Sequence, residues 1–188
     1  KGPGMGQVSV RSRRSSLAKL ERDLPDATII DVTSKAAEPW VRFSPFFPHG
    51  GIPIPFTKGR TAQSVEGIWQ ALKVFETADV EPKKLDVTAM KGLKRTVRKH
   101  GRCLGHREGL EGNRLLGYLE ARREIYLPIY TWVLEHKLTK ELEQLRKLVA
   151  RGDVVLLDYE TNTDLTNLNK PLSHAGLVAQ FLTNGALA

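Results

Sequence analysis

The sequence contains a single cysteine, Cys103, among its 188 residues. One cysteine cannot form an intramolecular disulfide or a cysteine-rich metal site, and this suits a reducing cytoplasm, where we expect the protein to act. We predict that Cys103 is buried. No stretch has about 18 uninterrupted apolar residues, so we predict neither a membrane span nor a membrane partner. The five histidines never fall in a recognised zinc spacing, and we predict no metal or other cofactor.

Several common nucleotide-site and hydrolase motifs are also missing. The sequence has no P-loop, no dinucleotide-binding fingerprint and no Gly-x-Ser-x-Gly nucleophile elbow. Internal repeats and low-complexity tracts are absent as well. What remains is a composition of 40% hydrophobic and 27% charged residues, which is normal for a globular protein and excludes wholesale disorder.

Positive charge is in excess, with a formal net charge of +8. This excess suggests an anionic partner such as nucleic acid, phosphate or pyrophosphate, although many small basic proteins use such charge only for solubility. A run of cations near the middle of the chain is predicted to line one face of a helix over 87–100, ended at Gly101. That face either binds phosphates or is simply solvated. Its cations are Lys91, Lys94, Arg95, Arg98, Lys99 and Arg102.

Hydrophobic periodicity predicts an α+β fold, mainly helical, with a few short strands. Apolar β-branched runs predict strands over 27–34 and 153–160. The predicted helices cover 15–24 (capped by Ser15 or Ser16), 63–77, 87–100, 115–138 (with a kink or break at Pro128), 139–151 (ended by Gly152) and 177–182. Residues 101–114 are predicted to form a Gly-rich turn region.

The predicted domain organisation is simple. We expect "KGPG" before Met5 to be a cloning remnant, residues 5–26 to be a basic N-terminal segment, and 27–188 to be one domain. Within that domain the stretch 38–56 has five prolines and five aromatic residues. Such a stretch predicts a long ordered loop with short extended pieces, and loops of this length are commonly functional.

The predicted helix over 63–77 carries a polar row beside its apolar stripe. Glu66, Gln70 and Lys73 are four and then three residues apart. Glu66 and Lys73 would lie two turns apart, about 10 Å, so both can converge on a ligand above Gln70. The alternative is an ordinary polar helix face. Gly67 is unfavourable inside a helix, and it indicates close approach of a ligand or of another backbone.

Two stretches together resemble a known family. "RFSPFF" at 42–47, followed by "SVEGIWQALKVF" at 64–75, resembles the signature of the NADAR (YbiA-like) superfamily. That signature has a Phe-Ser-Asn-Phe-like loop and then Glu, Gln, Lys and Phe at the spacing found here. The resemblance implies an α+β, mainly helical fold and N-glycosidase activity. It also makes Gly67 the space left beside Glu66 for a sugar.

Three departures from the family pattern mark this chain as a divergent branch. Pro45 stands where the loop asparagine is usual, and Gly67 replaces a histidine that often follows the glutamate. The Trp-Gly that usually follows the late aspartate is missing after Asp164. These departures affect the substrate more than the reaction class.

The resemblance implies roles for particular residues. Glu66 and Lys73 become the catalytic pair: a carboxylate can stabilise positive charge, activate water or shuttle protons, and a desolvated lysine can form a Schiff base. An aromatic pocket favours a neutral Lys73, whereas Glu66 opposes that loss of charge, and the sequence leaves the balance open. Asp164 is implied as a second carboxylate for the ribose hydroxyls, with Asp158 and Glu160 as rivals. Alternatively, Asp164 forms an Asx turn.

The remaining implied residues bind substrate. The aromatic ones either stack on a base or pack in the core, and the arginines can clamp a phosphate. The set is Phe43, Ser44, Phe46, Phe47, Trp69, Gln70, Arg102, Arg107 and Trp132.

The function expected from the resemblance is hydrolysis of a ribosyl or ADP-ribosyl nucleobase compound. Examples are ADP-ribosylated guanine in nucleic acid and a ribosyl phosphate intermediate like those of the riboflavin pathway. One alternative is a non-catalytic binder that uses the same pocket for a nucleotide or a nucleic acid end. Another is a basic nucleic-acid-binding module with the row as mere surface.

Overall fold

The computed structural model describes residues 5–187, so the predicted cloning remnant lies outside the described residues. Those residues confirm an α+β fold with more helix than strand. They group into two compact units. The first joins the N-terminal part of the chain through Ser44 with the C-terminal part from Leu134, and the second is Pro45–Val133. The prediction of one domain over 27–188 stays a prediction.

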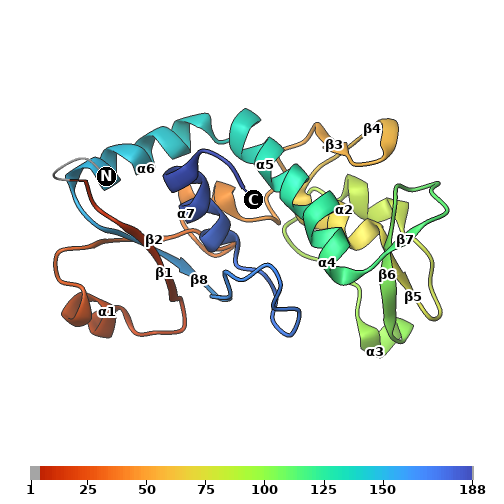
Figure 1. Ribbon diagram of the computed structural model, residues 1–188, viewed down its shortest axis with the longest axis horizontal. Helices are drawn as coiled ribbons and strands as arrows, with labels where there is room; N and C mark the ends of the chain where they lie inside the picture. Colours follow the sequence, from red (N-terminus) through yellow and green to blue (C-terminus); the bar gives the residue numbers. More distant parts are fainter. Residues whose placement is uncertain (1–4, 188) are drawn as a thin grey trace. The chain divides into compact units, whose positions relative to one another are not determined.

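The first unit is built on a parallel three-stranded sheet with the order β1-β8-β2. Its strands are β1 (Val8–Ser12), β2 (Thr28–Asp31) and β8 (Val154–Asp158), and every residue of the central β8 is buried. Helix α1 (Leu17–Asp23) packs Leu20 against Val155 and Leu157 of β8. Helix α7 (His174–Asn184) packs on β1 and β8, and Figure 1 shows it on the side of the sheet opposite α1. Both predicted strands are confirmed as β2 and β8, while β1 is a strand that the sequence pattern does not predict.

The helices of the first unit begin and end largely where their caps predict. The side chain of Ser16 accepts a hydrogen bond from the backbone of Lys19 and so caps α1. Helix α6 (Thr139–Arg151) ends at Gly152, as predicted. The predicted helix at 177–182 is longer in the structure, because Ser173 caps α7 and the helix begins at residue 174. The part of the proline-rich loop that belongs to this unit contains a 3-10 turn, η1 (Trp40–Phe43).

The second unit contains a hairpin, a small sheet and short helices. The hairpin joins β3 (Ile52–Ile54) and β4 (Thr57–Ala62). The sheet is antiparallel with the order β5-β6-β7, formed by β5 (Lys73–Phe75), β6 (Cys103–Arg107) and β7 (Leu115–Leu116). The helical elements are α2 (Val65–Ala71), the 3-10 turn η2 (Pro82–Asp86), α3 (Val97–His100), α4 (Tyr118–Ala121), the π-helical turn η3 (Arg122–Tyr126) and α5 (Leu127–His136). The second unit ends at Val133, inside α5.

The predicted helix over 115–138 is present as one run of helical backbone from 118 to 136. Pro128 does not break it. The π-helical turn η3 ends directly before α5, and Pro128 is only the second residue of α5. Such turns inside helices often mark sites where backbone hydrogen bonding must adapt, and proline requires this because it lacks an N–H group.

The predicted helix over 63–77 is wrong in its second half, because α2 ends at Ala71 and Lys73 begins a strand. Donors from other segments capture the carbonyl groups at this point. The backbone N–H of Glu81 donates to the carbonyl of Ala71 at 2.8 Å. That of Arg107 donates to Leu72 at 2.9 Å. These tertiary bonds replace the next helical turn.

The predicted basic helix over 87–100 is also wrong, since only residues 97–100 are helical. Gly92 has a φ of 76°, which is incompatible with a right-handed helix through that position. The six cations therefore do not share one helical face, and Arg95 among them is buried. The predicted turn region 101–114 in fact contains β6, which hydrogen-bonds to a strand on either side.

None of the helices within residues 5–187 combines the length and the apolar character needed to cross a membrane.

Candidate functional site

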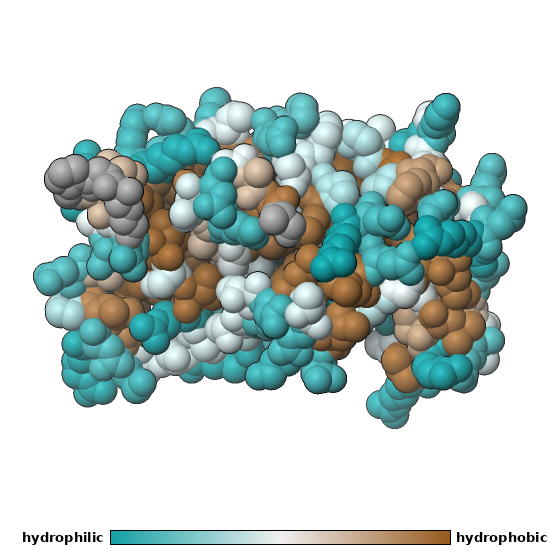
Figure 2. Space-filling model, in the orientation of Figure 1, coloured by the Kyte–Doolittle hydropathy of each residue, from teal (hydrophilic) through white to brown (hydrophobic). Residues whose placement is uncertain are grey.

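The second unit contains a cavity of about 270 Å³ between α2, α4 and the small antiparallel sheet. Helix α2 contributes Trp69, strand β5 contributes Lys73, and α4 contributes Tyr118. Strand β6 supplies the rest of the wall: Cys103, Leu104, Gly105 and His106. Leu104 and Tyr118 are both exposed, as is Leu115 of β7. Figure 2 shows hydrophobic surface beside hydrophilic surface where Figure 1 places this small sheet.

Glu66 is buried near the start of α2, with 9% of its surface exposed. The side chain of Ser64 caps the helix by accepting a hydrogen bond from the N–H of Gly67 at 2.9 Å. The amide Nε2 of Gln70 donates to Glu66 Oε1 at 2.6 Å. Burial raises the pKa of Glu66, while this hydrogen bond and the positive charges of Lys73 and Lys94 act against the rise. Glu66 is thus more readily protonated than an exposed glutamate.

Lys73 is half-buried at the start of β5 and lines the cavity. Burial lowers the pKa of its amine, whereas the Glu66 carboxylate acts in the opposite direction. The sequence left this balance open, and in the structure burial has the larger effect. Burial therefore moves the carboxyl of Glu66 and the amine of Lys73 towards their neutral forms. Groups whose pKa values are shifted in these directions are candidates for acid–base and nucleophilic roles.

His106 is a member of the wall that sequence reasoning missed. Its ring lies against the indole of Trp69, with 3.8 Å between the ring centroids. Burial, helped by the charge of Lys73, lowers the pKa of His106 to about 3, so the ring is neutral at physiological pH. The Trp69 backbone opposes this only weakly, and neither ring nitrogen makes a well-formed hydrogen bond within the described residues. No local pattern in the sequence distinguishes His106 from the other histidines.

Two further predictions for this region need correction. Cys103 is half-buried and lines the cavity rather than being buried. Gly67 is not a space for a sugar: a Cβ atom there would lie 2.7 Å from the backbone carbonyl oxygen of Lys84 in η2. The close approach that Gly67 permits is therefore that of another backbone, the second possibility that the sequence offered.

The other predicted residues of the second unit do not line this cavity. Phe46 is half-buried, with Lys94 Nζ 5.9 Å from its ring centroid. Phe47 lies against the ring of His49. Arg107 binds the carboxylate of Asp79 at 3.0 Å, and the exposed Arg102 pairs with Glu76. Trp132 is half-buried on α5.

Phe43, Ser44 and Asp164 belong to the first unit. Phe43 is fully buried in η1 and stacks on Trp40, and Ser44 is buried beside it in the chain. The carboxylate of the exposed Asp164 accepts hydrogen bonds from the N–H and hydroxyl of Thr166. This is the Asx-type turn that the sequence offered as an alternative. The implied role of Asp164 towards ribose hydroxyls stays a prediction.

One family model matches the chain over residues 12–178, that of the Family of unknown function (DUF6939). The chain belongs to the DUF6939 family. The match covers both the cavity residues and most of the first unit. No curated protein matches this DUF6939 chain. Its resemblance to the NADAR superfamily stays a prediction.

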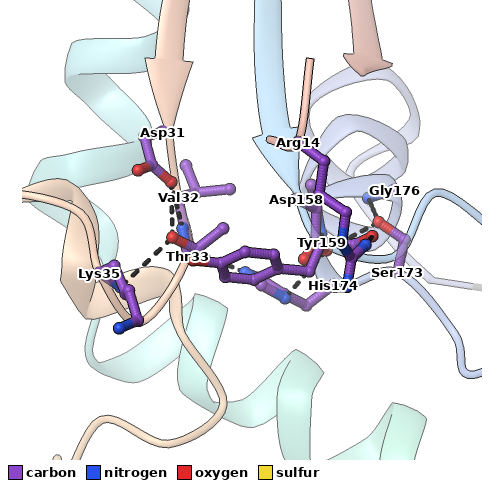
Figure 3. A network of polar contacts seen from close by, with 11 residues as sticks. Arg14, Asp31, Val32, Thr33, Lys35, Asp158, Tyr159, Ser173, His174 and Gly176 are labelled. Carbon is purple, nitrogen blue, oxygen red and sulfur yellow. Dashed lines mark hydrogen bonds and ion pairs between the residues drawn. The ribbon is translucent and has the colours of Figure 1, made fainter. Parts of the chain in front are cut away.

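The first unit of this DUF6939 chain holds a second polar cluster, at the carboxyl end of its sheet (Figure 3). Asp158 Oδ2 accepts hydrogen bonds from the hydroxyl of Ser173 at 2.8 Å and from the N–H of Ala175 at 3.1 Å. The ring of His174 lies between Asp158, 3.1 Å from Nδ1, and the carbonyl oxygen of Val32, 2.7 Å from Nε2. All of these partners belong to the first unit. The hydrogen bonds of Asp158 therefore join elements of that unit, which is a structural role.

Proposed function

We propose that this DUF6939 member is an N-glycosidase that hydrolyses a ribosyl or ADP-ribosyl nucleobase compound, with Glu66 and Lys73 as catalytic groups. The observation that carries the proposal is the state of Lys73. Its amine is half-buried, has a lowered pKa and lines a cavity together with Trp69 and Tyr118.

In the proposed reaction the neutral amine of Lys73 attacks C1 of the ribosyl group. The bond between C1 and the base nitrogen breaks, and its electron pair goes to the base. Glu66, in its protonated form, donates its proton to the departing base and then takes up the proton that the amine loses. Opening of the sugar ring gives an imine between Lys73 and C1. Water then adds to the imine, which restores the amine and releases the sugar, so that one water is consumed for each bond cleaved.

The cavity suits only part of such a substrate. Its volume of about 270 Å³ lies just below the range of about 300–1,000 Å³ that is usual for small-molecule sites. In the proposal Trp69 and Tyr118 contact the base, the sugar lies beside Lys73, and a pyrophosphate or polynucleotide extends outside. A cytoplasmic location remains part of the proposal, because the single cysteine suits a reducing compartment.

The test is to trap the imine. The protein is incubated with ADP-ribosylated guanosine or with a ribosyl phosphate N-glycoside, in the presence of sodium cyanoborohydride. We expect release of guanosine from the first substrate or of free base from the second, and a sugar adduct on the peptide that contains Lys73, detected by mass spectrometry. Lys73→Ala should abolish both, and Glu66→Gln should slow both by roughly 100-fold or more. The exposed Lys91→Ala is the matched control and should behave as wild type. Absence of both products with every glycoside would refute the proposal.

A non-catalytic nucleotide or nucleic-acid binder is the second candidate, and two observations favour it. Glu66 is not among the residues that line the cavity. In addition, Lys91, Lys94, Arg98 and Lys99 are all exposed. A binder would keep its affinity for ADP-ribose or an oligonucleotide in both Glu66→Gln and Lys73→Ala and show no turnover, as measured by calorimetry beside the trapping experiment.

A further inference from the structure

Arg95 is buried in the second unit, with only 6% of its surface exposed. Its guanidinium donates three hydrogen bonds to backbone carbonyl oxygens. Nη1 donates to Gln70 at 3.0 Å and to Lys73 at 2.7 Å, and Nη2 donates to Asp79 at 2.6 Å. One side chain therefore connects the last turn of α2, the first residue of β5 and the segment that follows β5.

The backbone of Arg95 acts on the same site. Its N–H donates to Gln70 Oε1 at 3.2 Å, and Gln70 Nε2 donates to Glu66 Oε1 at 2.6 Å. Because the oxygen of an amide only accepts and its nitrogen only donates, the bond from Arg95 fixes which end of Gln70 faces Glu66. The hydrogen bond that opposes the rise in the pKa of Glu66 thus depends on where Arg95 lies.

The surroundings of Arg95 keep its guanidinium charged and in place. Burial lowers the pKa of Arg95, but the acids Glu81 and Asp79 oppose that change, and a guanidinium stays protonated in proteins. Its Nε lies 3.9 Å from Glu81, and its central carbon lies 4.9 Å from the centroid of the Phe75 ring. A planar fork of donors is needed to span three carbonyls, so a lysine cannot replace it.

We propose that Arg95 is a positioning residue: its side chain fixes the turn that presents Lys73 to the cavity, and its backbone fixes the amide of Gln70 that donates to Glu66. The contribution of this role to catalysis rests on the proposed function. The positions of the Lys73 and Gln70 side chains can be measured without a substrate, so the positioning role and the glycosidase activity can be refuted separately.

The test compares wild type with Arg95→Lys, which keeps the charge and loses the fork. Two NMR readouts are used: hydrogen exchange of the Gln70 side-chain amide, and the pH titration of the Lys73 ε-carbon. In Arg95→Lys we expect roughly tenfold or faster exchange at Gln70, because the segment opens more often. We also expect the pKa of Lys73 to rise towards its ordinary value as the amine becomes more exposed. If the wild-type protein shows turnover, kcat of Arg95→Lys should fall by a larger factor than the factor by which KM changes.

The matched control is Lys94→Met. Lys94 also acts electrostatically on Lys73 and Glu66, and its side chain lies over the ring of Phe46. Removing its charge should raise the pKa of Lys73 slightly and leave exchange at Gln70 as in wild type. Wild-type values for both readouts in Arg95→Lys would overturn the proposal. Altered readouts without any turnover would support the positioning role while refuting the glycosidase.

A measurement on wild type covers the case in which Arg95→Lys does not fold. The three bonds to carbonyls predict resolved, slowly exchanging Nη protons for Arg95 with nuclear Overhauser contacts to Lys73. A single averaged Nη signal in fast exchange with water would overturn the proposal, because a guanidinium held by three carbonyls cannot rotate freely.

Discussion

At the scale of single residues, the site depends on two side chains that burial affects in opposite directions. Burial raises the pKa of Glu66 and lowers that of Lys73, so both move towards the neutral form. The charge of each group limits the shift of the other. A carboxyl and an amine with pKa values shifted in these directions, on consecutive elements of one unit, suit the proton transfer and nucleophilic attack of the proposed function.

Gly67 has a structural role, which the sequence offered as one of two possibilities. Its missing side chain leaves room for the carbonyl oxygen of Lys84, which would lie 2.7 Å from an added Cβ atom. The glycine therefore allows η2 to pack against α2, and its role is structural.

We predict that Gly67→Ala destabilises the protein by roughly 1–3 kcal/mol, because a backbone must move to admit the methyl group. Urea denaturation at constant pH measures the change in the free energy of unfolding. Gly117→Ala is the matched control, since a Cβ there has one neighbour within 4 Å, a Glu120 carboxylate oxygen at 3.8 Å. Equal stability of Gly67→Ala and Gly117→Ala would contradict the structural role given to Gly67.

At the scale of elements, hydrogen bonds from distant segments determine where α2 ends and where β5 begins. Donors from Glu81, Arg95 and Arg107 take the carbonyls at the end of the helix. Glu66, Gln70 and Lys73 are four and then three residues apart, and this spacing also fits a continuous helix through Lys73. No local pattern in the sequence reveals those donors, and this is why the predicted helix was too long.

In the first unit, the contact between β8 and the start of α7 depends on the buried pair of Asp158 and His174. Burial by itself would lower the pKa of His174, but the charge and hydrogen bonding of Asp158, with help from the Val32 carbonyl and Asp31, raise it above 6.5. The pKa of Asp158 is lowered below 3.8, because the imidazolium of His174 and the bonds from Ala175 and Ser173 outweigh the opposing effect of burial.

These directions give a pH dependence for the first unit. The contribution of His174 is fully present below pH 6.5 and is lost as the pH rises through its raised folded-state pKa. The contribution of Asp158 is present above pH 3.8 and is lost as the pH falls through its lowered pKa. We therefore expect the first unit to be more stable at about pH 5.5 than at about pH 8.5.

Fluorine NMR of 5-fluorotryptophan protein in urea can measure this, because Trp40 reports on the first unit while Trp69 and Trp132 report on the second. His174→Asn should lower the stability reported by Trp40 at pH 5.5 by roughly 3 kcal/mol and remove most of its pH dependence. The exposed His136→Asn serves as control and should keep the wild-type profile. A Trp40 transition that is independent of pH in wild type would disprove the role of the pair.

At the scale of the whole molecule, the net charge of +8 favours anionic partners, but its distribution differs from the prediction. The cations between 91 and 102 do not lie along one helix, and Arg95 is buried among backbone carbonyls. Arg98 and Lys99 remain exposed on α3 and are the best candidates for binding phosphates.

If this surface binds a polyanion, the double substitution Arg98→Glu and Lys99→Glu should weaken binding to a single-stranded oligonucleotide. The slope of log affinity against log salt should become shallower by roughly one to two. Fluorescence anisotropy at several salt concentrations provides the measurement. Lys140→Glu with Lys147→Glu, both on the exposed side of α6, changes the net charge equally. The same loss in both double variants would show that only net charge matters.

The sequence by itself determined the features that depend on local patterns. The apolar run of β8, the caps at Ser16 and Gly152 and the α+β class follow from periodicity and turn chemistry, which act over a few neighbouring residues. It also singled out Glu66, Gln70, Lys73 and Trp69. Lys73 and Trp69 line the cavity, and Gln70 donates a hydrogen bond to the buried Glu66.

Only the tertiary structure decided the features that need partners from distant segments. The membership of Cys103 and His106 in the cavity wall depends on the pairing of β6 with β5, which brings Cys103 opposite Phe75 and His106 opposite Lys73. The burial of Arg95 depends on carbonyls of Gln70, Lys73 and Asp79, and that of Gly67 on the backbone of Lys84. Burial in turn sets the proton affinities of Glu66 and Lys73, because desolvation acts through neighbours that the local sequence does not specify.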